Sequence, residues 1–227
     1  MNVNLRNYFV IFREVILCDK IGRQVRKLFR NKSERKRLTN HNFTILSQNC
    51  IGSIWYHDLG ERFCSPTINI KFNPDDFVKF LGNIKHYLDA PIKFVEDAAK
   101  PYPVGYLDDV YIEFVHYHSE HEVVSKWKER RKRINWNNMC IIACDGGMSD
   151  NARDLYLNLP IPNKILFTSR IDSQEHNAMH VTVISCPQFN DSAGADARLL
   201  NFCSVTGKRY YNNLIDYVDF LNSVKRL

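Results

Sequence analysis

Cys50 stands where a predicted strand gives way to a predicted helix, a position at which a side chain can do chemistry. The apolar run at residues 43–47 precedes it, and a helical pattern begins at Ile51. A cysteine at the N-terminus of a helix meets unpaired backbone N–H groups and the positive end of the helix dipole, which favour the thiolate. Cys50 is therefore a candidate nucleophile. The alternative is a cysteine that only packs in the core.

His116 and Asp145 also follow predicted strands. Apolar runs of the β type occupy residues 43–47, 110–116, 139–144 and 164–168, with helical patterns between them. Ligands of an open parallel sheet bind outside the carboxyl ends of its strands. We therefore expect Cys50, His116 and Asp145 to converge in one cleft as nucleophile, base and orienting acid. Alternatively, His116 is a polar strand end, and Asp145, which precedes two glycines, forms a turn.

These residue types favour acyl transfer to a sugar hydroxyl. Cys50 would attack an acyl donor, the backbone N–H of Ile51 or Gly52 would hold the oxyanion, and His116 would carry the proton. Gly52 would also allow close approach of the backbone. No bound cofactor is expected, and acetyl-CoA or another acyl-CoA is a possible co-substrate. Polar, aromatic and small residues near the predicted cleft are the expected substrate-binding positions: Asn49, Gly52, Ser65, Thr67, Asn69, Tyr106, Asp108 and Arg209.

The elements that must position these residues predict an α/β fold. Short apolar strands alternating with amphipathic helices favour a mainly parallel sheet in three layers. We expect one helix over residues 75–88, and another that starts at Ser119, where Glu122 completes a capping box. Residues 101–106 are expected to form an ordered loop over the site, or an ordinary crossover with structural prolines. The chain is divided into an arm at residues 1–41 and a single α/β domain at residues 42–227.

The arm carries more than the whole positive surplus of the chain. The net charge is +6, and residues 20–37 contain nine lysines and arginines against the single acid Glu34. Apolar residues recur at helical spacing, so the arm is predicted to be a basic amphipathic helix. It would lie on the anionic inner face of a membrane through residues 5–37, or dock on its own domain. Nucleic acid is not expected, because aromatic residues do not interleave with the basic run.

The cysteines indicate a reducing compartment. Seven cysteines form no CxxC pair and lie mostly in apolar runs, so free thiols in a cytoplasmic protein are expected. No bound metal is expected: a structural zinc site would need clustered ligands at short spacing. The apolar run at residues 8–18 is too short to span a bilayer and has no small-residue cleavage site. We therefore expect a cytoplasmic protein that is peripheral on the inner membrane face.

Several blocks of the sequence resemble a bacterial family of exopolysaccharide or capsule biosynthesis proteins of unknown function. The resemblance is carried from about residue 42 onward by residues 47–52, 65–69, 101–105, 114–117, 126–127, 133–135 and 207–211, with Arg130, and the arm lies outside it. It implies an α/β fold and a role in cell-surface polysaccharide assembly, with an O-acetyltransferase-like activity. The substrate would be a polysaccharide or its lipid-linked sugar precursor.

Two other function classes stay open. In a glycosyl- or phosphosugar transferase, acidic residues such as Asp108 or Asp145 would hold a divalent ion and basic clusters would hold the diphosphate. The chain has neither a DxD motif nor a glycine-rich phosphate loop to support that class. The third class is a non-catalytic component of a polysaccharide assembly complex.

Overall fold

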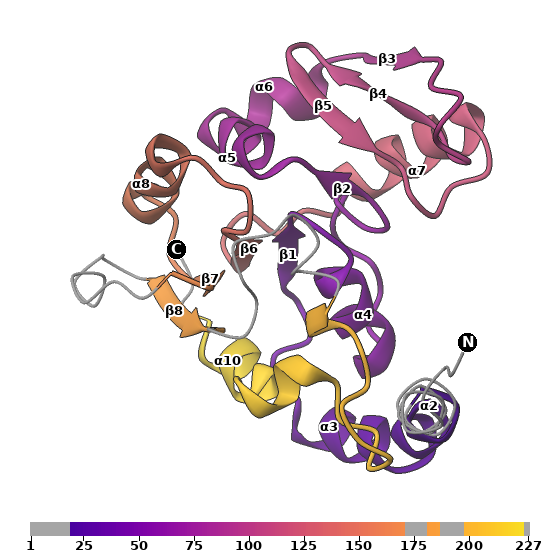
Figure 1. The fold of residues 1–227 in the computed structure, drawn as a ribbon, viewed down its shortest axis with the longest axis vertical. Coiled ribbons are helices and arrows are strands. Elements are labelled where there is room, and N and C mark those ends of the chain that lie inside the picture. Colours follow the sequence, from indigo (N-terminus) through magenta and orange to yellow (C-terminus); the bar gives the residue numbers. More distant parts are fainter. Residues whose placement is uncertain (1–18, 171–180, 187–197, 225–227) are drawn as a thin grey trace, which may run out of the picture.

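A parallel sheet forms the centre of the protein in the computed structural model, which describes residues 19–170, 181–186 and 198–224 (Figure 1). Its strand order is β1-β6-β7-β8, and all three pairings are parallel. The strands are β1 (Thr44–Ser47), β6 (Met139–Cys144), β7 (Lys164–Thr168) and β8 (Val181–Ser185). The predicted α/β fold class is confirmed, with strands placed close to the predicted apolar runs at 43–47, 139–144 and 164–168.

Helices cover both faces of this sheet and make three layers. In β6, Ile141 and Ala143 belong to one apolar cluster, and Cys140 and Ile142 belong to the other, because successive side chains of a strand point to opposite faces. The helices α5 (Pro74–Gly82) and α8 (Asp150–Asn158) pack in the first cluster, and α4 (Ile51–Leu59) and α10 (Tyr217–Ser223) pack in the second.

A second, antiparallel sheet was not expected from the sequence. Its order is β2-β5-β4-β3, from β2 (Lys71–Phe72), β5 (Val110–Glu113), β4 (Val104–Leu107) and β3 (Ile92–Val95). The run at 110–116 was predicted to lie in the parallel sheet, and this prediction is wrong. Only two residues, Asp108 and Asp109, connect β4 to β5, and Asp108 has a φ of 55°. Such a short connection makes a hairpin, whereas a parallel pair needs a long crossover.

The two sheets share one apolar cluster. The inward side chains of the antiparallel sheet, such as Leu107 and Ile112, pack with α5, α6 (Ile84–Asp89), α7 (Glu120–Arg131) and the first face of the parallel sheet. The single helix predicted over 75–88 is broken at Asn83, whose φ of −144° and ψ of 55° are not helical. The predicted helix start at Ser119 is confirmed, since its hydroxyl accepts a hydrogen bond from the Glu122 N–H.

The described part of the arm is helical and packs on the domain. It comprises α2 (Gly22–Val25), the π-helical segment η2 (Arg26–Arg30) and α3 (Asn31–Arg37). Arg26 is only 2% exposed, and its Nε and Nη2 atoms form ion pairs with Asp58 at 2.6 Å and Glu34 at 3.2 Å. Of the alternatives weighed for the arm, docking on its own domain holds for this part.

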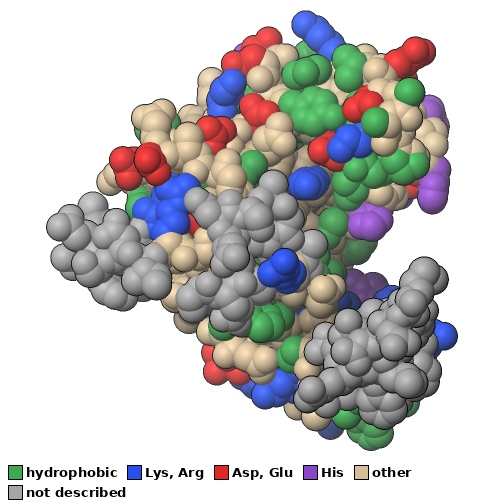
Figure 2. All heavy atoms as spheres, viewed as in Figure 1, with side chains coloured by type: hydrophobic (Ala, Val, Ile, Leu, Met, Phe, Trp, Pro, Cys, Tyr) green, Lys and Arg blue, Asp and Glu red, His purple; other side chains and the backbone are tan. Residues whose placement is uncertain are grey.

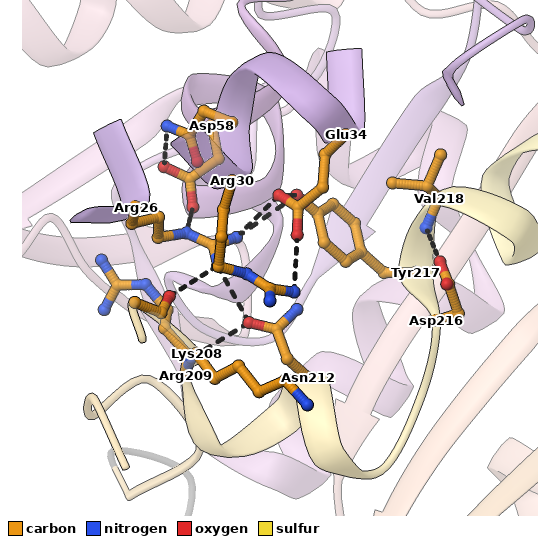
Figure 3. A network of polar contacts seen from close by, with 12 residues as sticks. Arg26, Arg30, Glu34, Asp58, Lys208, Arg209, Asn212, Asp216, Tyr217 and Val218 are labelled. Atoms are coloured by element: carbon orange, nitrogen blue, oxygen red, sulfur yellow. Dashed lines mark hydrogen bonds and ion pairs between the residues drawn. The ribbon is translucent and has the colours of Figure 1, made fainter. Parts of the chain in front are cut away.

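The C-terminal region contributes the other side of the same network (Figure 3). Arg26 also donates hydrogen bonds to the Gly207 carbonyl, the Asn212 side chain and the Tyr217 hydroxyl. Asn212 belongs to the 3₁₀ helix η4 (Tyr210–Asn213), and Tyr217 begins α10. One buried guanidinium therefore joins the arm, the end of α4 and the C-terminal elements.

Candidate functional site

The carboxyl ends of the parallel strands bring Gln48, Asn49, Cys144 and Asp145 together. The Gln48 Oε1 atom accepts a hydrogen bond from the Cys144 N–H at 2.8 Å, and Asn49 Nδ2 lies 3.6 Å from the Cys144 sulfur. These contacts form because β1 and β6 are paired neighbours in the sheet. We call this group of strand ends, with the residues that follow them, the carboxyl edge.

Cys50 lies at this edge as the N-cap residue of α4 and is partly exposed. The Asn49 Oδ1 atom accepts a hydrogen bond from the Ile51 N–H at 3.0 Å. Of the two backbone groups predicted to hold an oxyanion, the Ile51 N–H is therefore already engaged, which leaves that of Gly52 as the candidate. A β-carbon added to Gly52 would lie 2.7 Å from the Ser47 Oγ atom, so the backbone of Gly52 approaches β1 closely, and its predicted approach to a substrate stays a prediction.

Asp145 is fully buried and is held by cationic and hydroxyl groups. Its Oδ2 atom accepts hydrogen bonds from Arg153 Nε at 3.1 Å and Thr168 Oγ1 at 2.5 Å, and Arg170 Nε lies 4.0 Å away. Its Oδ1 atom has no hydrogen-bond partner among the described residues. Asp145 was predicted to orient His116, but its partners among the described residues are Arg153, Arg170 and Thr168.

Cys186, just after β8, also belongs to the carboxyl edge. Burial and then the charge of Asp145 raise the pKa of its thiol to about 12. Cys186 is therefore a neutral, buried thiol at neutral pH, which distinguishes it from the partly exposed Cys50.

His116 is exposed in the turn after β5, so it comes from the antiparallel sheet and not from the parallel one. Its turn is nevertheless tied to α4. The next residue, Tyr117, donates a hydrogen bond to the Ile68 carbonyl at 2.9 Å, and the adjacent Asn69 N–H donates to Ser53 Oγ in the first turn of α4 at 2.8 Å. The prediction that His116 follows a strand of the parallel sheet, as Cys50 does, is wrong. The turn that carries His116 is instead connected to α4 through the hydrogen bonds of Tyr117 and Asn69.

Ser65 and Thr67 lie behind β1, the edge strand of the parallel sheet. Both are 0% exposed, and Thr67 Oγ1 accepts a hydrogen bond from the Ser47 N–H at 3.0 Å. The two hydroxyls lie 3.0 Å apart. They were predicted to bind substrate, and the structure shows them in contact with the protein backbone. Asn69 is partly exposed beside them, with a φ of 63°.

Three other predicted substrate-binding residues lie elsewhere. Tyr106 is on β4, and Asp108 is in the β4–β5 turn, where its Oδ2 atom lies 3.1 Å from His86 Nε2 and accepts a hydrogen bond when that nitrogen carries a proton. Arg209 stacks on the Phe202 ring at 4.3 Å, and burial lowers the pKa of its guanidinium. It neighbours Asp58, about 12 Å along α4 from Cys50 at 1.5 Å per residue. These three residues are not part of the carboxyl edge.

Sequence reasoning missed Arg153. It comes eight residues after Asp145, in the helix that follows β6, and its side chain turns back to that carboxylate. The sequence contained an indication of this contact. An arginine in the first turn of a helix that follows a strand and a glycine-containing loop can reach back to the end of that strand. Arg170, which follows β7, was not predicted as a site residue, and it also forms an ion pair with Asp150 at 2.6 Å.

The described residues contain neither a metal-binding cluster nor a membrane-spanning helix. Within that part of the chain, no group of three or more histidine, cysteine or acidic side chains is placed to hold a metal ion. In the same ranges, no helix has the length and apolarity that crossing a bilayer requires.

Two comparisons place the chain among known proteins. A family model described as a domain of unknown function, DUF1919, matches residues 21–222. An uncharacterized protein of Haemophilus influenzae is 34% identical over 197 residues, which make up 86% of this chain and 92% of the relative. The family match begins within the arm, so the expectation that similarity starts at about residue 42 is corrected. The early start agrees with the docking of the arm through Arg26.

Proposed function

The chain belongs to the DUF1919 family, and we propose that it is an acyltransferase of cell-surface polysaccharide biosynthesis with Cys50 as its nucleophile. One observation carries the acyl-transfer part of this proposal. Cys50 is partly exposed at the first turn of a nine-residue helix, directly after a parallel strand and beside the carboxyl edge. The polysaccharide part rests on the resemblance of the sequence blocks.

The reaction would proceed in two steps. The Cys50 thiolate attacks the carbonyl carbon of an acyl-CoA, the tetrahedral oxyanion meets the Gly52 N–H, and coenzyme A leaves as a thiol after taking up a proton. A sugar hydroxyl then attacks the acyl-cysteine, loses its proton to a base and restores the Cys50 thiolate. His116 is the proposed base, because its turn is hydrogen-bonded to the segment that contacts α4.

Asp145 has a positioning role in this proposal. It holds Arg153 and Arg170 at the carboxyl edge, where guanidinium groups suit the phosphates of an acyl-CoA donor. The same two arginines favour a second candidate, a phosphosugar transferase, whose donor would carry a diphosphate. A non-catalytic role in an assembly complex is the third possibility, and it predicts no covalent intermediate.

Intact-protein mass spectrometry after incubation with a panel of acyl-CoA and nucleotide-sugar donors tests the proposal. We expect the mass of one acyl group to be added by an acyl-CoA, and lost in Cys50→Ala. The matched control is Cys64→Ala, which removes another partly exposed thiol and keeps the adduct. Consumption of a nucleotide sugar without an adduct would favour the phosphosugar transferase.

The proposed location is the cytoplasmic side of the membrane, with the basic arm on its anionic surface. Three lysines of the arm, Lys27, Lys32 and Lys36, are exposed, while Arg26 is buried in the domain. Leu28 and Phe29 are 50% and 67% exposed beside them. Exposed lysines with apolar neighbours are the combination with which an amphipathic helix meets anionic lipid.

A further inference from the structure

The outer face of the antiparallel sheet carries tyrosines and lysines in two ordered rows. The first row crosses three strands through Lys93, Tyr106 and Tyr111, which are register partners. The second row crosses all four strands through Val95, Val104, Glu113 and Lys71. Residues two apart on a strand share a face, so both rows lie on one surface, which we call the tyrosine face.

This surface is on the side of the sheet away from the core. The inward residues of β4 and β5 pack with α5, α6 and α7, whereas Tyr106 and Val95 are 38% and 43% exposed. Figure 2 shows hydrophobic side chains with lysines and carboxylates among them over β3, β4 and β5, in the upper part of the view. The rings of Tyr106 and Tyr111 have centroids 5.3 Å apart.

A carboxylate is held in place within this face. Glu113 is 7% exposed, and its Oε2 atom accepts hydrogen bonds from Lys100 Nζ at 2.9 Å and the Tyr102 hydroxyl at 2.7 Å. Burial opposes the charged form of Glu113, but these two hydrogen bonds outweigh burial and lower its pKa. The accessible part of the face is therefore Tyr106, the partly exposed Tyr111 and the ammonium groups of Lys71 and Lys93, whereas Val104 and Glu113 of the second row are buried.

Charge and shape favour one class of occupant. Lys93 is exposed and can meet an anionic group, and Lys71, also exposed, lies opposite Glu113 and helps to stabilise the charged form of that carboxylate. Lys93 also lines a cavity of about 560 Å³ with Lys85, His86, Asp89 and Asp108 at the β3 side of the face. These side chains both donate and accept hydrogen bonds, as sugar hydroxyls do.

We propose that the tyrosine face binds an acidic polysaccharide chain, with sugar rings packed on Tyr106 and Tyr111 and sugar carboxylates near Lys71 and Lys93. A nucleic-acid strand is the alternative occupant, because its bases would also stack on tyrosines, but it has fewer hydroxyl groups than a sugar chain to donate hydrogen bonds to Asp108 and Asp89. The inference deepens the proposed function and rests on it in one respect: it identifies the polymer on this face as the acceptor of acyl transfer.

The face leads directly to the carboxyl edge. Its second row ends at Lys71 on β2, and the N–H of the next residue, Phe72, donates a hydrogen bond to the Gln48 carbonyl at 2.9 Å. Gln48 precedes Cys50 by two residues. A chain lying across the sheet toward β2 would therefore bring its end to the predicted nucleophile.

Binding of a labelled oligogalacturonide, measured by fluorescence polarisation at low salt, tests the proposal. We expect Tyr106→Ala combined with Tyr111→Ala to weaken binding by about tenfold or more, as for a stacking aromatic pair. Lys93→Glu, which alters an exposed side chain, should weaken it by about threefold or more. Phe29→Ala, at an exposed aromatic on the arm, should leave it unchanged. Added salt should also weaken binding.

Three results would overturn the inference. They are unchanged binding in both the tyrosine and the Lys93 variants, equal binding of a neutral cello-oligosaccharide, and tighter binding of an oligouridylate that the same variants abolish. Cys50→Ala separates this inference from the proposed function. If the unmodified protein binds the oligogalacturonide but forms no acyl adduct, the tyrosine face is supported and the acyltransferase proposal is refuted. If it forms the adduct but does not bind the oligogalacturonide, the acyltransferase is supported and the tyrosine face is refuted.

Discussion

Gly52 shows how single residues shape the carboxyl edge. It lies in the first turn of α4, where its backbone approaches β1 so closely that a β-carbon would be 2.7 Å from Ser47 Oγ and 2.9 Å from Ile45 Cγ2. Gly52 follows the candidate nucleophile by two residues, and the sequence indicated that it would allow a close approach of the backbone, but not that β1 would be the neighbour. The role of Asn49 in accepting the Ile51 N–H was not predictable, since it depends on a side-chain rotamer.

Gly52→Ala is expected to destabilise the protein by about 1–3 kcal/mol, because Ser47 and Ile45 belong to a buried strand and cannot move away without loss of packing. Urea unfolding measures this change. The matched control is Gly82→Ala at the end of α5, where no atom lies within 4 Å of the added carbon. That variant should gain about 0.5 kcal/mol. Equal stability of the two variants would contradict the close approach.

At the scale of elements, patterns in neighbouring residues predicted individual helices and strands better than they predicted how the strands pair. The helix cap at Ser119 and the apolar strands of the parallel sheet depend on neighbouring residues, and both are present, although the Glu122 carboxylate accepts from the His118 N–H and does not close the predicted capping box. Neighbouring residues do not determine the strand partner of β5, because a short apolar run is compatible with either a parallel or an antiparallel sheet. Residues 101–106 were predicted to form a loop, but Val104–Leu107 form β4, and the two-residue turn at Asp108 and Asp109 joins this strand to β5.

The contact between the arm and α4 depends on Arg26. Arg26→Ala should destabilise the protein by about 3–5 kcal/mol, because it removes the arginine that pairs with the buried Asp58 and leaves the buried Glu34 with only the partly exposed Arg30. Thermal and urea unfolding measure the loss. Arg23→Ala is the matched control on the same helix: its ion pair with Asp19 is exposed, and its removal should change stability by less than about 0.5 kcal/mol.

A small loss for Arg26→Ala, comparable to that of Arg23→Ala, would contradict the role of Arg26 as the joint between the arm and the domain. The sequence could not identify this residue. Arg26 was one of nine basic residues in the arm, and its burial follows from Asp58, Asn212 and Tyr217, which are distant in the chain.

For the whole molecule, the basic arm has two faces with different tasks. One face is fixed to the domain by Arg26, Asn31 and Glu34, all buried. The other exposes Lys27, Lys32 and Lys36. The sequence predicted the amphipathic helix and its charge, but only the packing shows which basic residues remain available to a partner.

Replacement of Lys27, Lys32 and Lys36 by glutamate should abolish binding to vesicles that contain anionic lipid, because each lysine near such a surface contributes about 1 kcal/mol. Vesicle co-sedimentation at two salt concentrations measures the effect, and circular dichroism should show an unchanged fold. The control replaces Lys126, Lys128 and Lys132, a basic cluster on and just after α7, in the same way. If only the control variant lost binding, the membrane-facing role of the arm would be refuted.

The central claim is that Cys50 is an activated nucleophile, and its alkylation rate tests this most directly. The rate with iodoacetamide at neutral pH is followed for each cysteine by peptide mass spectrometry. Cys64 is an internal reference that is also partly exposed, and burial raises the pKa of its thiol although Arg133 and Arg62 offset part of this effect. Cys203 is an exposed reference. Cys50 should react several times faster than both, and its rate should change little as the pH is raised from 7 to 9. A Cys50 that reacts no faster than Cys203, and accelerates with pH as an ordinary thiol does, would contradict the account.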